Sequence, residues 1–134
     1  MKLSHFLSVL FVSGVFLAAC QKEPTVTASP AKGDLKFLGS GECNPMIING
    51  SYKKDTLLTA DNYIDIQIEF TETGTYSIAT DTINAYYFTN SGFITDRGSQ
   101  TIRLQGAGRP YAVSMDTFHI NFDGKSCVAG ITVL

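Results

Sequence analysis

The sequence predicts an all-β protein with one folded domain, an antiparallel β-sandwich of about seven strands. Apolar and polar residues alternate with a period of two through several runs after residue 35, which is typical of strands with one buried face. Short segments that contain glycine separate these runs, as turns do in sandwiches. Beyond the N-terminal leader, no stretch shows the periodicity of an amphipathic helix.

The first nineteen residues have the pattern of an export signal. Lys2 supplies a positive charge, and Phe6 to Ala19 form an apolar run that is too short to cross a bilayer as a permanent helix. We therefore expect residues 1–19 to be a signal peptide that is removed, and to take no part in the fold.

The end of this leader reads Leu17-Ala18-Ala19-Cys20. An ordinary leader peptidase prefers small residues at the first and third positions before its cut, and Leu17 would occupy the third position. The stretch resembles the lipobox of bacterial lipoproteins, in which a dedicated peptidase cuts before a cysteine that carries a diacylglycerol on its sulfur. The resemblance implies that Cys20 is the lipid-bearing first residue and that its lipid attaches the protein to a membrane.

The residues after Cys20 bear on location. Gln21-Lys22-Glu23 resembles the short charged signals of lipoproteins exported to the surface of some Gram-negative bacteria, and Gln21 is similar to the residue found in lipoproteins released to the outer membrane. We expect a lipid-anchored protein of the Gram-negative outer membrane, with exposure at the cell surface as a further expectation.

Residues 20–34 are expected to be the lipidated N-terminus and a flexible tether. They contain two prolines, small residues and almost no apolar side chain to bury, a composition that favours an extended, solvated chain. The sandwich domain would then occupy residues 35–134.

Cysteine usage predicts one disulfide. If Cys20 carries lipid, Cys43 and Cys127 remain as an even pair in a compartment that permits oxidation. We expect a bond between them that links the first part of the sandwich to its last strand. The alternative is two buried free thiols.

The strands follow from the alternation. In Tyr63 to Phe70, the inward positions are Ile64, Ile66, Ile68 and Phe70. A turn over 71–74 and a strand over 75–80 predict that these two strands form a hairpin. Further strands are expected at 85–89, 100–104 and 117–122, with turns at Ser91-Gly92 and at Gly106-Ala107-Gly108.

The last strand begins after Asp123-Gly124. This pair favours a two-residue type I′ turn, because both central residues of that turn need a positive φ. Inward positions then follow at Cys127, Ala129, Ile131 and Val133, whereas His119 in the preceding strand falls on the outer face.

Several segments are similar to repeat modules of secreted and cell-surface bacterial proteins that have an immunoglobulin-like sandwich. They are Gly74–Thr80, Asn84–Phe88, Ser91–Phe93, Gln100–Gly108 and Asp116–Ile120, with Cys127. The resemblance implies an immunoglobulin-like fold. It implies no functional residue, because that family has no assigned catalytic site. Those modules usually have Asn-Gly before the tyrosine, where this chain has Asn84-Ala85.

Composition and candidate sites argue against catalysis and nucleic-acid binding. The chain has 10 Lys and Arg against 12 Asp and Glu, and no basic cluster accompanies aromatic residues. We expect no catalytic residues, no cofactor and no metal. A calcium site remains as an alternative to ordinary turn chemistry for a set of oxygen-bearing residues: Asp61, Asn62, Asp65, Asp81 and Asn84.

Aromatic residues form a candidate ligand patch for a glycan or a peptide: Tyr86, Tyr87, Phe93 and Tyr111. Neighbours on a strand face opposite sides, so either Tyr87 or its flanking residues must belong to the core.

Three Asp-Thr-apolar tripeptides resemble O-glycosylation sites of exported bacterial proteins and place candidate sites at Thr56, Thr82 and Thr117. The alternative is that Asp-Thr pairs simply form turns.

Taken together, these patterns predict a lipid-anchored, non-enzymatic envelope module for adhesion, ligand binding or envelope structure. Its expected partners are the membrane, through the lipid on Cys20, and an extracellular protein or glycan, with no nucleic acid. The alternative is a small envelope enzyme or inhibitor that acts on polysaccharide, peptidoglycan or a protease.

Overall fold

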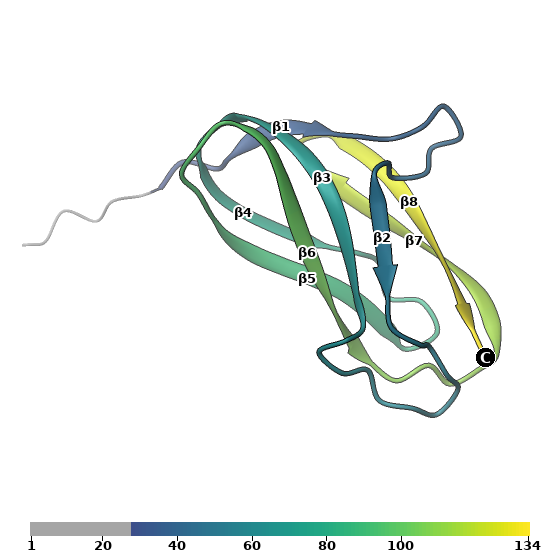
Figure 1. The fold of residues 1–134 in the computed structure, drawn as a ribbon. Helices are drawn as coiled ribbons and strands as arrows, with labels where there is room; N and C mark the ends of the chain where they lie inside the picture. Colours follow the sequence, from purple (N-terminus) through teal and green to yellow (C-terminus); the bar gives the residue numbers. More distant parts are fainter. Residues whose placement is uncertain (1–27) are drawn as a thin grey trace, which may run out of the picture.

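The computed structural model describes residues 28–134, in which eight strands and no helix are formed (Figure 1). The all-β prediction is confirmed. Nowhere in this range is there a helix long and apolar enough to cross a membrane. The signal peptide, Cys20 and the first part of the tether lie outside the described residues. The strands are β1 (Lys32–Leu35), β2 (Met46–Asn49), β3 (Tyr63–Glu72), β4 (Gly74–Ala79), β5 (Tyr86–Ile94), β6 (Gly98–Gly108), β7 (Ser114–Phe122) and β8 (Lys125–Val133).

The strands form two antiparallel sheets that enclose one core. The larger sheet has the order β1-β3-β6-β5-β4, and β2 joins it by pairing with β3 beyond the end of β1. The smaller sheet is the hairpin of β7 and β8. The ring of Phe118 in β7 lies 4.9 Å from that of Tyr86 and 5.2 Å from that of Phe88 in β5, so aromatic packing joins the sheets.

The alternation predicts the buried faces correctly. Every second side chain of β3, from Ile64 to Phe70, is almost fully buried, and so is every second side chain of β8, from Cys127 to Val133. His119 is exposed on the outer face of β7, as expected. Burial of these apolar surfaces is the main stabilising contribution to such a domain.

Cys43 and Cys127 form the predicted disulfide, which joins the segment before β2 to β8 across a sequence separation of 84 residues. A cross-link over a loop of this length stabilises a fold by roughly 4 to 5 kcal/mol at most, through the entropy that it removes from the unfolded chain.

The predicted hairpin of the strands at 63–70 and 75–80 is wrong, because β3 and β4 are not paired. The N-terminal segment occupies the position that β3 would need. Ala31 N donates to Thr75 O at 2.7 Å, and Thr75 N donates to Ser29 O at 3.0 Å. At Gly74 a Cβ would lie 2.0 Å from Ser29 O, so only glycine fits this close approach.

The fold also begins earlier than residue 35. β1 starts at Lys32, inside the stretch expected to be tether, and Ala31 is buried. These residues are ordered because their backbone pairs with β3 and with Thr75, although their side chains are mostly small or polar.

Two segments expected to be turns lie inside strands. Ser91-Gly92 belongs to β5 and Gly106-Ala107-Gly108 to β6. β5 changes partner along its length, pairing with β6 at 86–89 and with β4 at 89–94, so it continues past the point where a simple hairpin strand would end. Gly92 gives room to the Tyr76 ring, since a Cβ there would lie 2.9 Å from the Tyr76 hydroxyl.

Two tight turns have positive φ at both central residues. Asp123 and Gly124 have φ values of 45° and 75°, as a type I′ turn requires. Asn84 and Ala85 have φ values of 51° and 63°, and Ile83 and Tyr86 exchange backbone hydrogen bonds around them. The turn therefore forms with alanine at its second central position, at a cost of about 1 kcal/mol for a left-handed alanine.

Candidate functional site

The candidate site is the end of the sandwich that carries the C-terminus. It is formed by the loops 50–62 and 109–113, the turn 83–85 and Leu134, and we call it the distal end. The described part of the chain begins at the opposite end of the sandwich, beside β1 and β4 (Figure 1).

Loop 50–62 is held rigidly against the rest of the domain. Its side chains Tyr52 and Leu58 are buried in the core. Its backbone donates from Lys54 N to Leu134 O at 2.8 Å and from Asp55 N to Pro110 O at 2.7 Å. The loop is therefore an ordered platform and not a free excursion of the chain.

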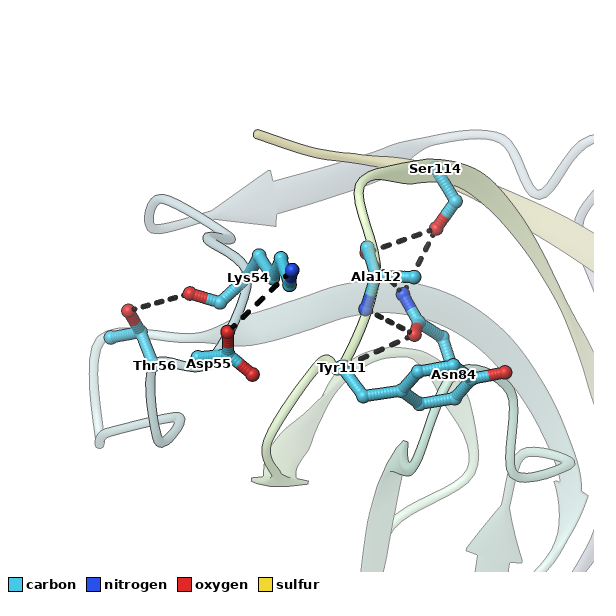
Figure 2. Close-up of polar contacts among 7 residues, drawn as sticks. All are labelled: Lys54, Asp55, Thr56, Asn84, Tyr111, Ala112 and Ser114. Atoms are coloured by element: carbon cyan, nitrogen blue, oxygen red, sulfur yellow. Dashed lines mark hydrogen bonds and ion pairs between the residues drawn. The ribbon is translucent and has the colours of Figure 1, made fainter.

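The side chain of Asn84 fixes loop 109–113. Its Oδ1 accepts hydrogen bonds from the backbone N–H groups of Tyr111 at 3.1 Å and Ala112 at 3.0 Å. Its Nδ2 donates to Ala112 O at 2.8 Å and lies 2.9 Å from Ser114 Oγ (Figure 2). One amide group thus ties a tight turn to a neighbouring loop.

Asp116 is a buried carboxylate beneath these loops. One of its oxygens accepts hydrogen bonds from Tyr86 Oη at 2.9 Å and Asn84 Nδ2 at 3.0 Å, and the other accepts one from Ser114 Oγ at 2.7 Å. Burial, together with the hydrogen bond to the Asp116 carboxylate and its charge, raises the pKa of Tyr86. Several hydrogen bonds compensate the carboxylate for the loss of water, so the network stabilises one arrangement of the loops.

Exposed apolar side chains gather on this end. Val113, Met115 and Leu134 are between 66 and 78 % exposed, and Tyr111 is 65 % exposed. Ser114 pairs with Val133, which places Val113 beside Leu134, and the alternation of β7 puts Val113 and Met115 on one face. We call these four residues the distal patch.

The loops around the distal patch carry charges of both signs. Lys53, Lys54 and Arg109 are exposed there, as are Asp61 and Asp55, which lies 3.9 Å from Lys54 in an ion pair (Figure 2). An exposed apolar patch with a polar rim is typical of an interaction surface.

The aromatic candidates do not form one patch. Tyr86 is wrong as a ligand residue, because its ring is fully buried and its hydroxyl is bound to Asp116. Tyr87 and Phe93 are exposed on β5 but lie six residues apart, roughly 20 Å along a strand. Tyr111 is the member that belongs to the distal patch.

The oxygen-bearing residues considered for calcium do not meet either. Asn62 closes its own loop, with Oδ1 accepting from Thr59 N and Nδ2 donating to Ser51 O. Asp65 accepts two hydrogen bonds of 2.9 Å from Arg103. Within residues 28–134, no group of three or more His, Cys, Asp or Glu residues could hold a metal ion.

Asp81 is engaged by His119. Its carboxylate accepts a hydrogen bond from His119 N at 2.8 Å and lies 2.9 Å from Nδ1 of the ring. Partial burial alone would raise the pKa of Asp81, but the hydrogen bonds and charge of His119 lower it overall. This exposed pair joins the segment after β4 to β7.

Thr56, Thr82 and Thr117 are all exposed, in a distal loop, between β4 and β5 and on β7 respectively. Thr56 Oγ1 makes a long hydrogen bond of 3.3 Å to Lys54 O (Figure 2). Their glycosylation stays a prediction.

Sequence reasoning missed the Asp116 network and most of the distal patch. A signal for Asp116 was present, since it lies on the same alternation as the inward Phe118, Ile120 and Phe122. A carboxylate at an inward position indicates a buried polar network.

Comparisons with protein-family models, curated proteins and solved structures found no match to this chain.

Replacing Asn84 by aspartate tests the role of its amide. The acceptor for the loop N–H groups is kept, but a second carboxylate replaces the donor next to Asp116. We expect Asn84→Asp to lower the free energy of unfolding at pH 7 by about 2–3 kcal/mol, measured by urea denaturation. Asn121→Asp, on the exposed face of β7, is the matched control and should change it by less than about 0.5 kcal/mol. Equal effects of both would contradict this role.

Because the hydroxyl of Tyr52 is buried, we expect the protein to lose stability at high pH. Burial raises the pKa of Tyr52 to about 12, and its hydroxyl donates a hydrogen bond to Asn49 O at 2.9 Å. Since the folded pKa lies above the unfolded one, its contribution is complete below pH 10 and is lost as the pH rises toward 12. Over this range the free energy of unfolding should therefore fall less steeply with pH for Tyr52→Phe than for the native protein. The two slopes should differ by up to about 1.4 kcal/mol per pH unit. Parallel curves for the two proteins would show the interpretation to be wrong.

Proposed function

We propose that this protein is a lipid-anchored lipoprotein of the Gram-negative envelope, at the outer membrane, whose sandwich is a non-enzymatic module for adhesion, ligand binding or envelope structure. The observation that carries the proposal is Leu17-Ala18-Ala19-Cys20. The disulfide adds support, because Cys43 and Cys127 are bonded to each other and the chain has three cysteines, so Cys20 remains for lipid.

The arrangement of the domain supports a binding role. The chain comes in at one end of the sandwich and the distal patch lies at the other (Figure 1). A lipid on Cys20 would hold the first end near the membrane and direct the distal patch away from it. Apolar side chains with a charged rim suit an extracellular protein or a glycan as the contact.

A small enzyme or inhibitor gains no comparable support. A shallow depression of about 100 Å³ beside β2 is lined by Asp65, Gln67 and Thr101 among apolar residues. Its one carboxylate, Asp65, is already held by Arg103 at 2.9 Å. Catalysis by paired groups needs a free acid or base beside a reacting atom.

Replacement of Cys20 tests the anchor. We expect the native protein to sediment with membranes and Cys20→Ala to appear in the soluble fraction, because a lipid chain supplies the membrane affinity. Thr25→Ala, in the same N-terminal segment, is the control and should remain with the membranes. Mass spectrometry of the native protein should find a first residue Cys20 that carries lipid. Firm membrane association of Cys20→Ala would refute the proposal.

A further inference from the structure

The segment from Glu42 to Lys53 is hydrogen-bonded to β8 at both ends but not in its middle. Cys43 N donates to Val128 O, and Val128 N donates to Gly41 O, which pairs Glu42 with Val128. At the other end Leu134 N donates to Tyr52 O, and Lys54 N donates to Leu134 O. Residues 42 and 53 are eleven positions apart in the segment, whereas residues 128 and 134, to which these two ends are bonded, are six positions apart. The extra residues carry β2 away from β8 to pair with β3.

β8 presents unused backbone groups along this gap. Val128 and Leu134 direct their N–H and C=O groups away from β7, toward the segment 41–54. Backbone groups alternate in direction along a strand, so Gly130 and Thr132 direct theirs the same way. No partner for these groups is present among residues 28–134, and both residues are exposed.

β2 presents the facing edge. Gln67 O accepts from Lys36 N, which shows that the odd-numbered residues of β3 face β1 and β2. Ile47 pairs with Asp65, and so exchanges its hydrogen bonds with β3. Met46 and Ile48, which alternate with it, direct their N–H and C=O groups away from β3.

The core is incompletely covered at this place. Met46 and Ile48 are paired with Ile66 and Ile64, whose side chains are fully buried, so all four side chains face inward. The side chains of Met46 and Ile48 nevertheless remain partly exposed. We call the gap in backbone pairing between the edge of Met46–Ile48 and the edge of Gly130–Thr132 the seam.

We propose that the seam binds an extended segment of a partner polypeptide, which adds as a β-strand and completes the sandwich. Backbone groups of Gly130 and Thr132 on one side, and of Met46 and Ile48 on the other, would supply its hydrogen bonds, as in other cases of strand addition.

The chemistry of the seam selects the segment. Residues 46–49 and 128–133 carry no charged side chain. The bound segment is therefore uncharged, with apolar side chains at the alternate positions that cover Met46 and Ile48. The opposite edge of the large sheet is bonded at both of its ends, because Pro30 pairs with Thr75 and Thr80 pairs with Ile120.

The segment comes from another molecule. Pro30 pairs with Thr75 of β4, whereas the seam lies between β2 and β8 (Figure 1). With Cys20 as the first residue, residues 20–27 would span at most roughly 26 Å when fully extended, and would be used in crossing the domain. The inference goes beyond the proposed function, and only the exclusion of the chain's own N-terminus rests on cleavage before Cys20.

Binding of a defined probe tests the seam. The probe is a labelled tetrapeptide of alternating threonine and valine with blocked ends, short enough to lie between the two closed ends of the seam, and it is titrated against the full chain by fluorescence anisotropy. Gly130→Pro removes an N–H that faces the seam and takes no part in the ladder with β7, whereas the control Gly130→Ala keeps it. We expect native protein and Gly130→Ala to bind equally, and Gly130→Pro at least fivefold more weakly.

Thr132→Pro, with Thr132→Ser as its control, repeats the comparison at the second outward N–H, so the test survives misfolding of one proline variant. Absence of probe binding to the native protein, or equal binding by folded proline variants, would overturn the proposal. The Cys20→Ala chain should bind the probe like the native protein, so a failed lipid anchor and a failed seam give different results.

Discussion

The Cys43–Cys127 disulfide fixes the start of a segment that must hydrogen-bond to both sheets. Next to it Glu42 pairs with β8, and eleven residues later Lys53 returns to β8. Between these points β2 belongs to β3. The two sheets are consequently closed against each other at both ends of this side and left unpaired in the middle. The seam thus arises because one short segment bonds to β8 at its two ends and to β3 in its middle.

The same segment organises the distal end. Where the segment returns to β8, Lys54 N donates a hydrogen bond to Leu134 O and Asp55 N donates one to Pro110 O. From the other side, Asn84 and the buried Asp116 hold loop 109–113. Loops fixed on both sides can keep apolar side chains exposed without collapsing onto them, which is what an interaction surface needs. Binding surfaces and fold therefore rest on the same few contacts.

Features that depend on neighbouring residues could be predicted from the sequence. The buried faces of β3, β7 and β8 follow from alternation, and the Asp123-Gly124 turn follows from its need for positive φ. The disulfide followed from counting cysteines.

Features that depend on distant pairing could not be predicted in the same way. β3 and β4 are separated because the backbone groups of Thr75 are hydrogen-bonded to Ser29 and Ala31. No local sequence pattern indicates that this pairing replaces the hairpin. Alternation left open whether Tyr87 or its flanking residues were buried. The packing of the Tyr86 ring against Phe118 shows that the flanking residues are buried. The seam was equally out of reach, since it arises from where a segment bonds and not from which residues it contains.

Amide hydrogen exchange of the protein alone tests the open seam most directly. Ala129 and Ile131 direct their N–H groups into the ladder with β7, whereas Gly130 and Thr132 direct theirs into the seam. The account predicts exchange at least about a hundredfold faster at Gly130 and Thr132 than at Ala129 and Ile131. Equal protection at all four positions would show that these groups are already bonded and that the seam is closed.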